Sequence, residues 1–198
     1  MTMSLTTNPP PTDADAPARL ALRRYFLAKH HAAAPLDVLD CAHLPGDFWL
    51  RLRQDPAVAV ATYWSLPQKP RKGQPRLDPQ QVLCQSGWRF NVIDLHLRRS
   101  PWPAWLALLP RVTRPLTVFL TVGRYRDGDG LVLDVLGCGD MDIPLPLAKK
   151  LQPLAVSYFL DRARQHGLTV AEAAEVPGRG PARNLGLHLL PATPGNGA

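Results

Sequence analysis

Residues 90–122 read FNVIDLHLRRSPWPAWLALLPRVTRPLTVFLTV, and this stretch decides the fold. It opens with an apolar run at Phe90–Leu95 and closes with another at Leu116–Val122, which is typical of strands buried on both faces. Between them, Ser100 and Pro101 favour the start of a helix over Trp102–Leu109. The order strand, helix, strand predicts two parallel strands joined by a crossover helix.

The same alternation extends through the rest of the chain. The expected elements are a helix at Ala18–His31, a strand at Leu36–Cys41, a helix at Phe48–Gln54 capped by Asp47, a strand at Val58–Trp64, a short strand at Arg76–Asp78, a helix from Pro79 to about Gln85, a long helix at Leu145–His166 stopped by Gly167, and a hairpin of strands at Leu168–Val176 and Arg183–Leu190. In the first helix, the apolar residues fall near one face, opposite the arginines and lysine. Together these elements predict an α/β fold: a Rossmann-like, seven-stranded, mostly parallel sheet with helices on both faces and a C-terminal antiparallel hairpin.

Length and composition predict one globular domain. The chain has 198 residues, and we expect a single domain over 18–191 with disordered tails at 1–17 and 192–198. The three cysteines stand in unrelated contexts without zinc-ligand spacing, so we expect a cytoplasmic protein with no metal centre. The sequence also lacks a secretory signal pattern and an apolar run of about 18 residues, so we expect no membrane span.

The net charge of +7 favours nucleic acid or another anionic partner. The candidate phosphate-contacting rim follows the second and fourth expected strands and consists of Lys69, Arg71, Lys72, Arg76, Arg98 and Arg99. A solvated basic loop is the alternative interpretation. Four tryptophans, Trp64, Trp88, Trp102 and Trp105, are candidates for stacking on bases, with a place in the core as the alternative.

The segment LDVLDCAHLPGDFW resembles the first strand and loop of class I S-adenosylmethionine (SAM)-dependent methyltransferases. In that family, an acidic residue ends the first strand and a glycine-bearing loop follows beneath the cofactor. The resemblance implies that Asp40 is this acid and that Gly46 is the surviving glycine. It also implies that Asp78, after the third strand, lies near the adenine, although Asp78 is equally suited to cap the next helix.

The segment NVIDLHLRRSPWPAW is similar to the acceptor loop of the RNA and DNA amino-methyltransferases. The resemblance implies that Asp94, Ser100, Pro101 and Trp102 line a slot for an exocyclic amine. His96 is a candidate base, with a structural histidine as the alternative.

Two hypotheses about function follow. The first is a SAM-binding methyltransferase-like protein that acts on nucleic acid or another anionic substrate. The second is a catalytically inactive accessory or regulatory protein of plasmid or phage type, which keeps the fold and binds nucleic acid or a protein through its basic edge. The second is favoured by the TYWSLPQK segment, which lacks the family's ribose-binding acid, and by bulky residues in the glycine loop.

Overall fold

The computed structural model describes residues 16–41, 47–66, 77–85, 87–97, 100–122, 154–178 and 183–191. Its helices are α1 (Ala16–His30), α2 (Asp47–Leu52), α3 (Pro79–Cys84), α4 (Trp102–Leu108), which continues into a 3₁₀ turn at Leu109–Arg111, and α7 (Ala155–Gln165). Its strands are β1 (Leu36–Asp40), β2 (Val60–Ser65), β3 (Val92–Leu95), β4 (Leu116–Val122), β5 (Thr169–Pro177) and β6 (Arg183–Leu190). The predicted strand–helix alternation and the terminal hairpin are confirmed over these ranges.

The sheet is mixed, with its strands in the order β2-β1-β3-β4-β6-β5. The four strands from β2 to β4 are parallel to one another, whereas β6 runs antiparallel to both β4 and β5. The sheet therefore has six strands within the described ranges, and the prediction of seven is wrong for this part of the chain.

The missing strand is the short one predicted at Arg76–Asp78. Leu77 and Asp78 belong to no strand, and Arg76 lies outside the described residues. The reason is local, because the Asp78 carboxylate accepts a hydrogen bond from the Gln80 N–H at 2.9 Å and Pro79 occupies the first turn of α3. The chain is thus committed to a helix at the point where the strand was expected.

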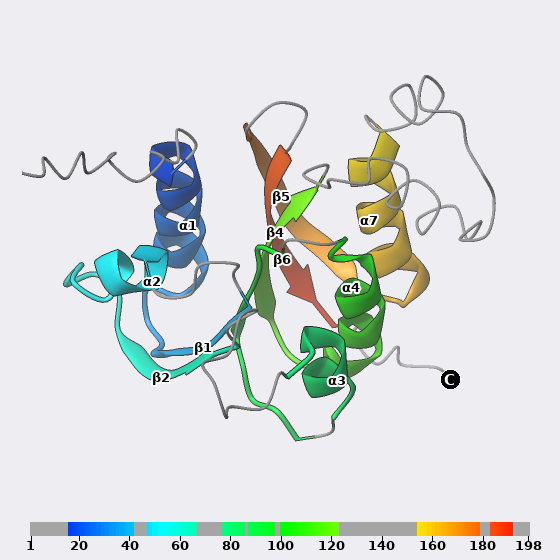
Figure 1. The fold of residues 1–198 in the computed structure, drawn as a ribbon, viewed down its shortest axis with the longest axis horizontal. Helices are drawn as coiled ribbons and strands as arrows, with labels where there is room; N and C mark the ends of the chain where they lie inside the picture. Colours follow the sequence, from blue (N-terminus) through cyan, green and yellow to red (C-terminus); the bar gives the residue numbers. More distant parts are fainter. Residues whose placement is uncertain are drawn as a thin grey trace, which may run out of the picture.

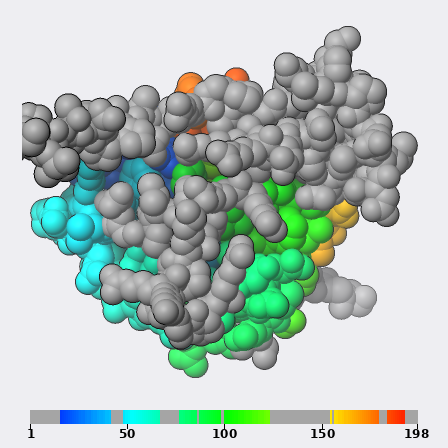
Figure 2. All heavy atoms as spheres, in the orientation of Figure 1, coloured from blue at the N-terminus to red at the C-terminus, as the bar shows by residue number. Residues whose placement is uncertain are grey.

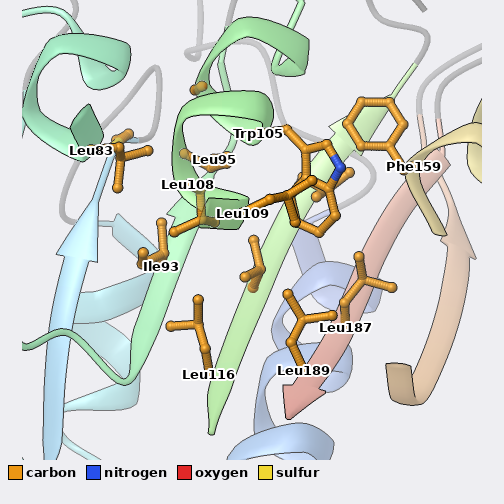
Figure 3. Close-up of a cluster of buried hydrophobic side chains, with 14 of the residues drawn as sticks. Leu83, Ile93, Leu95, Trp105, Leu108, Leu109, Leu116, Phe159, Leu187 and Leu189 are labelled. Carbon is orange, nitrogen blue, oxygen red and sulfur yellow. The ribbon is translucent and has the colours of Figure 1, made fainter. Parts of the chain in front are cut away.

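Helices cover the sheet on both faces (Figure 1). One face carries α1 and α2, and the opposite face carries α3, α4 and α7. The larger apolar cluster lies on the second face, where α4 and α7 pack on leucines and isoleucine from β3, β4 and β6 (Figure 3). In the space-filling view of Figure 2, the cyan atoms of α2 lie at the left of the visible face, and the green atoms of α3 and α4 lie at its right and lower parts.

Two glycines occupy positions that a side chain would disturb, one for a conformational reason and one for a steric reason. Gly167 follows α7 with φ of 76°, a left-handed conformation that ends helices, as predicted. Gly186 in β6 lies under the Phe26 ring, and a Cβ at this position would stand 2.6 Å from a ring carbon. Helix α1 can therefore approach β6 closely only because residue 186 has no side chain.

Helix α1 buries two arginines that the sequence placed on its solvent face. Leu22, Phe26 and Leu27 are buried as predicted, but Arg19 and Arg23 are also buried, and Tyr25 is 49 % exposed. The arginines lie on the sheet side because they have polar partners there. In the described part of the chain, no helix combines the length and apolar character needed to cross a bilayer.

Candidate functional site

Two acidic side chains lie next to each other where the parallel strands end. Asp40 is the last residue of β1, Asp94 is the penultimate residue of β3, and the two are register partners. Both are only 1 % exposed. The carboxyl edge of an open α/β sheet is where such folds bind ligands, so this edge is the candidate site.

The Asp94 carboxylate is engaged by α1 and α2. Arg23 donates to it twice, from Nε to Oδ2 at 2.8 Å and from Nη2 to Oδ1 at 2.9 Å, and Trp49 Nε1 donates to Oδ2 at 3.2 Å. The Arg23 guanidinium lies between the rings of Phe48 and Phe119, 4.9 and 5.0 Å from their centroids. This buried bidentate pair holds α1 against the sheet and takes up much of the hydrogen-bonding capacity of Asp94.

Asp40 has a different environment. The Tyr63 hydroxyl of β2 donates to its Oδ2 at 2.6 Å. Burial, together with the neighbouring Asp40 charge, raises the pKa of Tyr63 far above 10, so this hydroxyl stays protonated and continues to donate. Burial and the nearby carboxylates also raise the pKa of Cys41, so this thiol is not a reactive nucleophile.

His96 follows β3 and belongs to a buried polar chain. Arg19 Nη1 lies 2.6 Å from His96 Nε2, and His96 Nδ1 contacts the Thr121 hydroxyl, which donates to Asn184 Oδ1 at 2.8 Å. Because a guanidinium can only donate, Nε2 accepts and Nδ1 carries the ring proton. This arrangement fixes the tautomer of His96 and directs its lone pair at Arg19.

The remaining predicted site residues make contacts of their own, although the charge of Asp78 also contributes to the raised pKa of Cys41, next to Asp40. Asp78 caps α3. Ser100 and Pro101 lie directly before α4, where the Ser100 hydroxyl accepts from the Trp102 N–H at 3.2 Å. Trp102 is 4 % exposed and packs edge-on against Phe159 of α7 at 4.9 Å, in the core of the opposite face. Their roles toward a cofactor or acceptor stay predictions.

Gly46 and the predicted basic rim, Lys69, Arg71, Lys72, Arg76, Arg98 and Arg99, lie outside the described residues. Within the ranges that the structure describes, no group of three or more His, Cys, Asp and Glu side chains is arranged to hold a metal ion.

Sequence reasoning missed the partners of the two acids, which are Arg23, Trp49 and Tyr63. Arg23 and Asp94 are 71 positions apart, so no local motif joins them. The available signal was the spacing of Arg19, Arg23 and Phe26, which places all three on the buried stripe of one helix.

A histidine cluster fixes the other end of α1. The His30 ring stacks on His188 of β6 at 3.9 Å, and Thr117 Oγ1 lies 2.8 Å from His31 Nε2 and 3.0 Å from His188 Nδ1. Burial, with the charge of His30, lowers the pKa of both His31 and His188 from 6.5 to about 4. Glu172 of β5 faces the cluster, with Lys29 and His30 as its partners.

We expect the protein to lose stability as the pH falls from 6.5 toward 4. In this window the unfolded chain protonates His31 and His188 while the folded protein keeps them neutral, so protons favour unfolding. Because His31 is only half-buried, which weakens its contribution, we expect about 1–2 kcal/mol in total. Urea unfolding at pH 7.5 and 4.5 measures this loss of stability, which should be smaller in His188→Asn.

Glu172 adds a separate effect at lower pH. Hydrogen bonds from Lys29 and Tyr25 hold the pKa of its carboxylate at about 2, so its contribution to stability is lost only below pH 4.5.

The fold is similar to those of several solved structures. Trm1 from Pyrococcus horikoshii, in complex with SAM, matches with a TM-score of 0.59 and 14 % identity over 90 % of this chain and 55 % of its own, so this chain spans about half of that protein. The N-methyltransferase NodS from Bradyrhizobium japonicum WM9, in complex with S-adenosylhomocysteine (SAH), matches with a TM-score of 0.53 and 11 % identity over 91 % and 90 % of the two chains. A candidate hemolysin from Lactococcus lactis matches with a TM-score of 0.56 and 14 % identity over 87 % and 86 %.

No protein-family profile matches the chain, and no curated protein matches it significantly. The structural likenesses nevertheless confirm the predicted Rossmann-like α/β fold, with six described strands in place of seven, as a divergent version of the class I SAM-dependent methyltransferase fold.

Proposed function

We propose that this chain is a SAM-binding methyltransferase-like protein whose cofactor site lies at the carboxyl edge of β1. The observation that carries the proposal is the placement of Asp40. It ends β1 at the carboxyl edge of the parallel strands, in a fold shared with proteins that hold SAM or SAH. A buried carboxylate at this edge suits the hydroxyl, amine and ammonium groups of such a ligand.

The residues of this chain have limited chemical work to do in such a reaction. When bound, SAM supplies a methyl group that its sulfonium already activates. Asp40, with Gly46 and Asp78, would hold the cofactor, and Tyr63 orients Asp40 through its hydroxyl. The protein's contribution is then alignment and exclusion of water. The net charge of +7 supports nucleic acid or another anionic molecule as the acceptor.

We expect Asp40→Ala to weaken SAH binding about tenfold or more, since it removes a charged hydrogen-bond acceptor. Calorimetric titration with SAM and SAH measures the change. Asp37→Ala is the matched control, because Asp37 lies in the same strand near its other end and should leave the affinity unchanged. Thermal unfolding of both variants separates lost binding from lost folding. Wild-type protein that releases no heat with millimolar SAM or SAH would contradict the proposal.

The second candidate, an accessory protein without methyl transfer, is favoured by the contacts of Asp94. The amine slot that the sequence implies needs a carboxylate oxygen free to accept from an amine, whereas both oxygens of Asp94 already accept from Arg23, and one of them also accepts from Trp49. Trp102, the implied wall of the slot, lies in the opposite core. Nucleic-acid binding without any SAM or SAH affinity would favour this candidate over the first.

A further inference from the structure

The tryptophans differ sharply in exposure. All five fall within the described ranges: Trp49, Trp102 and Trp105 are buried and Trp88 is half-buried, but Trp64 is 58 % exposed. Trp64 pairs in register with Leu39, a member of the core cluster on the side of α3 and α4. Its side chain therefore lies on that side of β2, which is an edge strand of the described sheet, one residue before the strand ends.

The exposed indole is backed by other aromatic rings. Trp64 meets Phe90 edge to face at 6.0 Å and 68°, and Phe90 is in turn stacked with Trp88 at 6.1 Å and 21°. The Trp88 indole N–H donates to the Leu83 carbonyl at 3.2 Å, which ties the group to α3. An indole held in this way loses little conformational entropy when another ring stacks on it.

We propose that Trp64 is a stacking platform for an unpaired base of a single-stranded nucleic acid. The ligand class follows from the exposed aromatic ring together with the charge of the chain. Arg89 is exposed between Trp88 and Phe90, and the protein carries a net charge of +7. Sequence-tolerant single-strand binding combines these two features, namely aromatic side chains for the bases and cations for the phosphates. The inference rests on the nucleic-acid part of the proposed function and is independent of SAM binding.

The test is binding of a fluorescein-labelled 12-mer of deoxythymidine, measured by anisotropy at 50 mM salt with protein up to about 100 μM. We expect Trp64→Ala to weaken this binding about tenfold, the size of effect that loss of one base–aromatic stack produces. Leu50→Ala is the matched control, because Leu50 is an equally exposed apolar residue, at 59 %, and lies on α2. A 12-mer of uridine shows whether the platform distinguishes RNA from DNA.

A second variant keeps the test independent of folding. Trp64→Phe retains a stacking ring, so its affinity should stay within about threefold of wild type. It removes the exposed indole, so the quenching of tryptophan fluorescence by the oligonucleotide should disappear. The proposal is overturned if Trp64→Ala and Leu50→Ala bind alike, if quenching persists in Trp64→Phe, or if the wild-type protein binds no single strand. A SAH titration of Trp64→Ala, expected to match wild type, shows separately whether the cofactor proposal holds.

Discussion

Replacing Arg23 by Met should lower the free energy of unfolding by about 3–5 kcal/mol, because it leaves the Asp94 carboxylate buried without its countercharge. Asp94 is 1 % exposed, and Arg23 supplies two of the three hydrogen bonds described above. Met fills a similar volume between Phe48 and Phe119, so the loss reports the charge rather than a cavity. Urea unfolding at pH 7 measures it.

Two further variants give this prediction its control. Replacing both partners, as Arg23→Met with Asp94→Leu, should restore most of the stability, because no unpaired charge then remains. Arg164→Ala, which breaks the exposed pair with Asp161, should cost less than about 1 kcal/mol. If Arg23→Met is no more destabilising than Arg164→Ala, the pair does not hold α1 on the sheet.

The Arg23–Asp94 pair shows which features of the structure could be predicted from the sequence and which could not. Continuous apolar runs indicate buried strands, and a Ser-Pro pair or a glycine indicates where a helix begins or ends. The alternation of strands and helices that defines the fold was therefore predictable from the sequence. A polar residue in a helix is normally assigned to solvent, and this rule failed for Arg19 and Arg23. Their burial depends on Asp94 and His96, which only the folded chain brings close to them.

Local motifs were ambiguous for a related reason. Asp78 before a proline and Ser100 before another proline suit a helix start as well as a ligand site, and the structure shows both in contact with the first turn of a helix. Asp40 is the exception among the predicted residues, since it ends β1 at the carboxyl edge of the sheet, a position that no helix start explains. The expected place of Asp40 at a strand end therefore agrees with the structure, while its role toward a cofactor stays a prediction.

Trp102→Ala should destabilise the protein by about 3–5 kcal/mol, because it empties a large buried volume between α4 and α7. Trp102 is 4 % exposed and lies edge-on to Phe159, itself fully buried, at 4.9 Å. We expect SAH affinity, measured under conditions where the variant is folded, to remain within about threefold of wild type, since Trp102 lies in the cluster on the other side of the sheet from the Asp40 side chain. A cycle with Phe159→Ala should show a coupling of about 1 kcal/mol between the two rings. The opposite result, little loss of stability together with lost SAH binding, would show that Trp102 acts at the ligand site and is not a core residue.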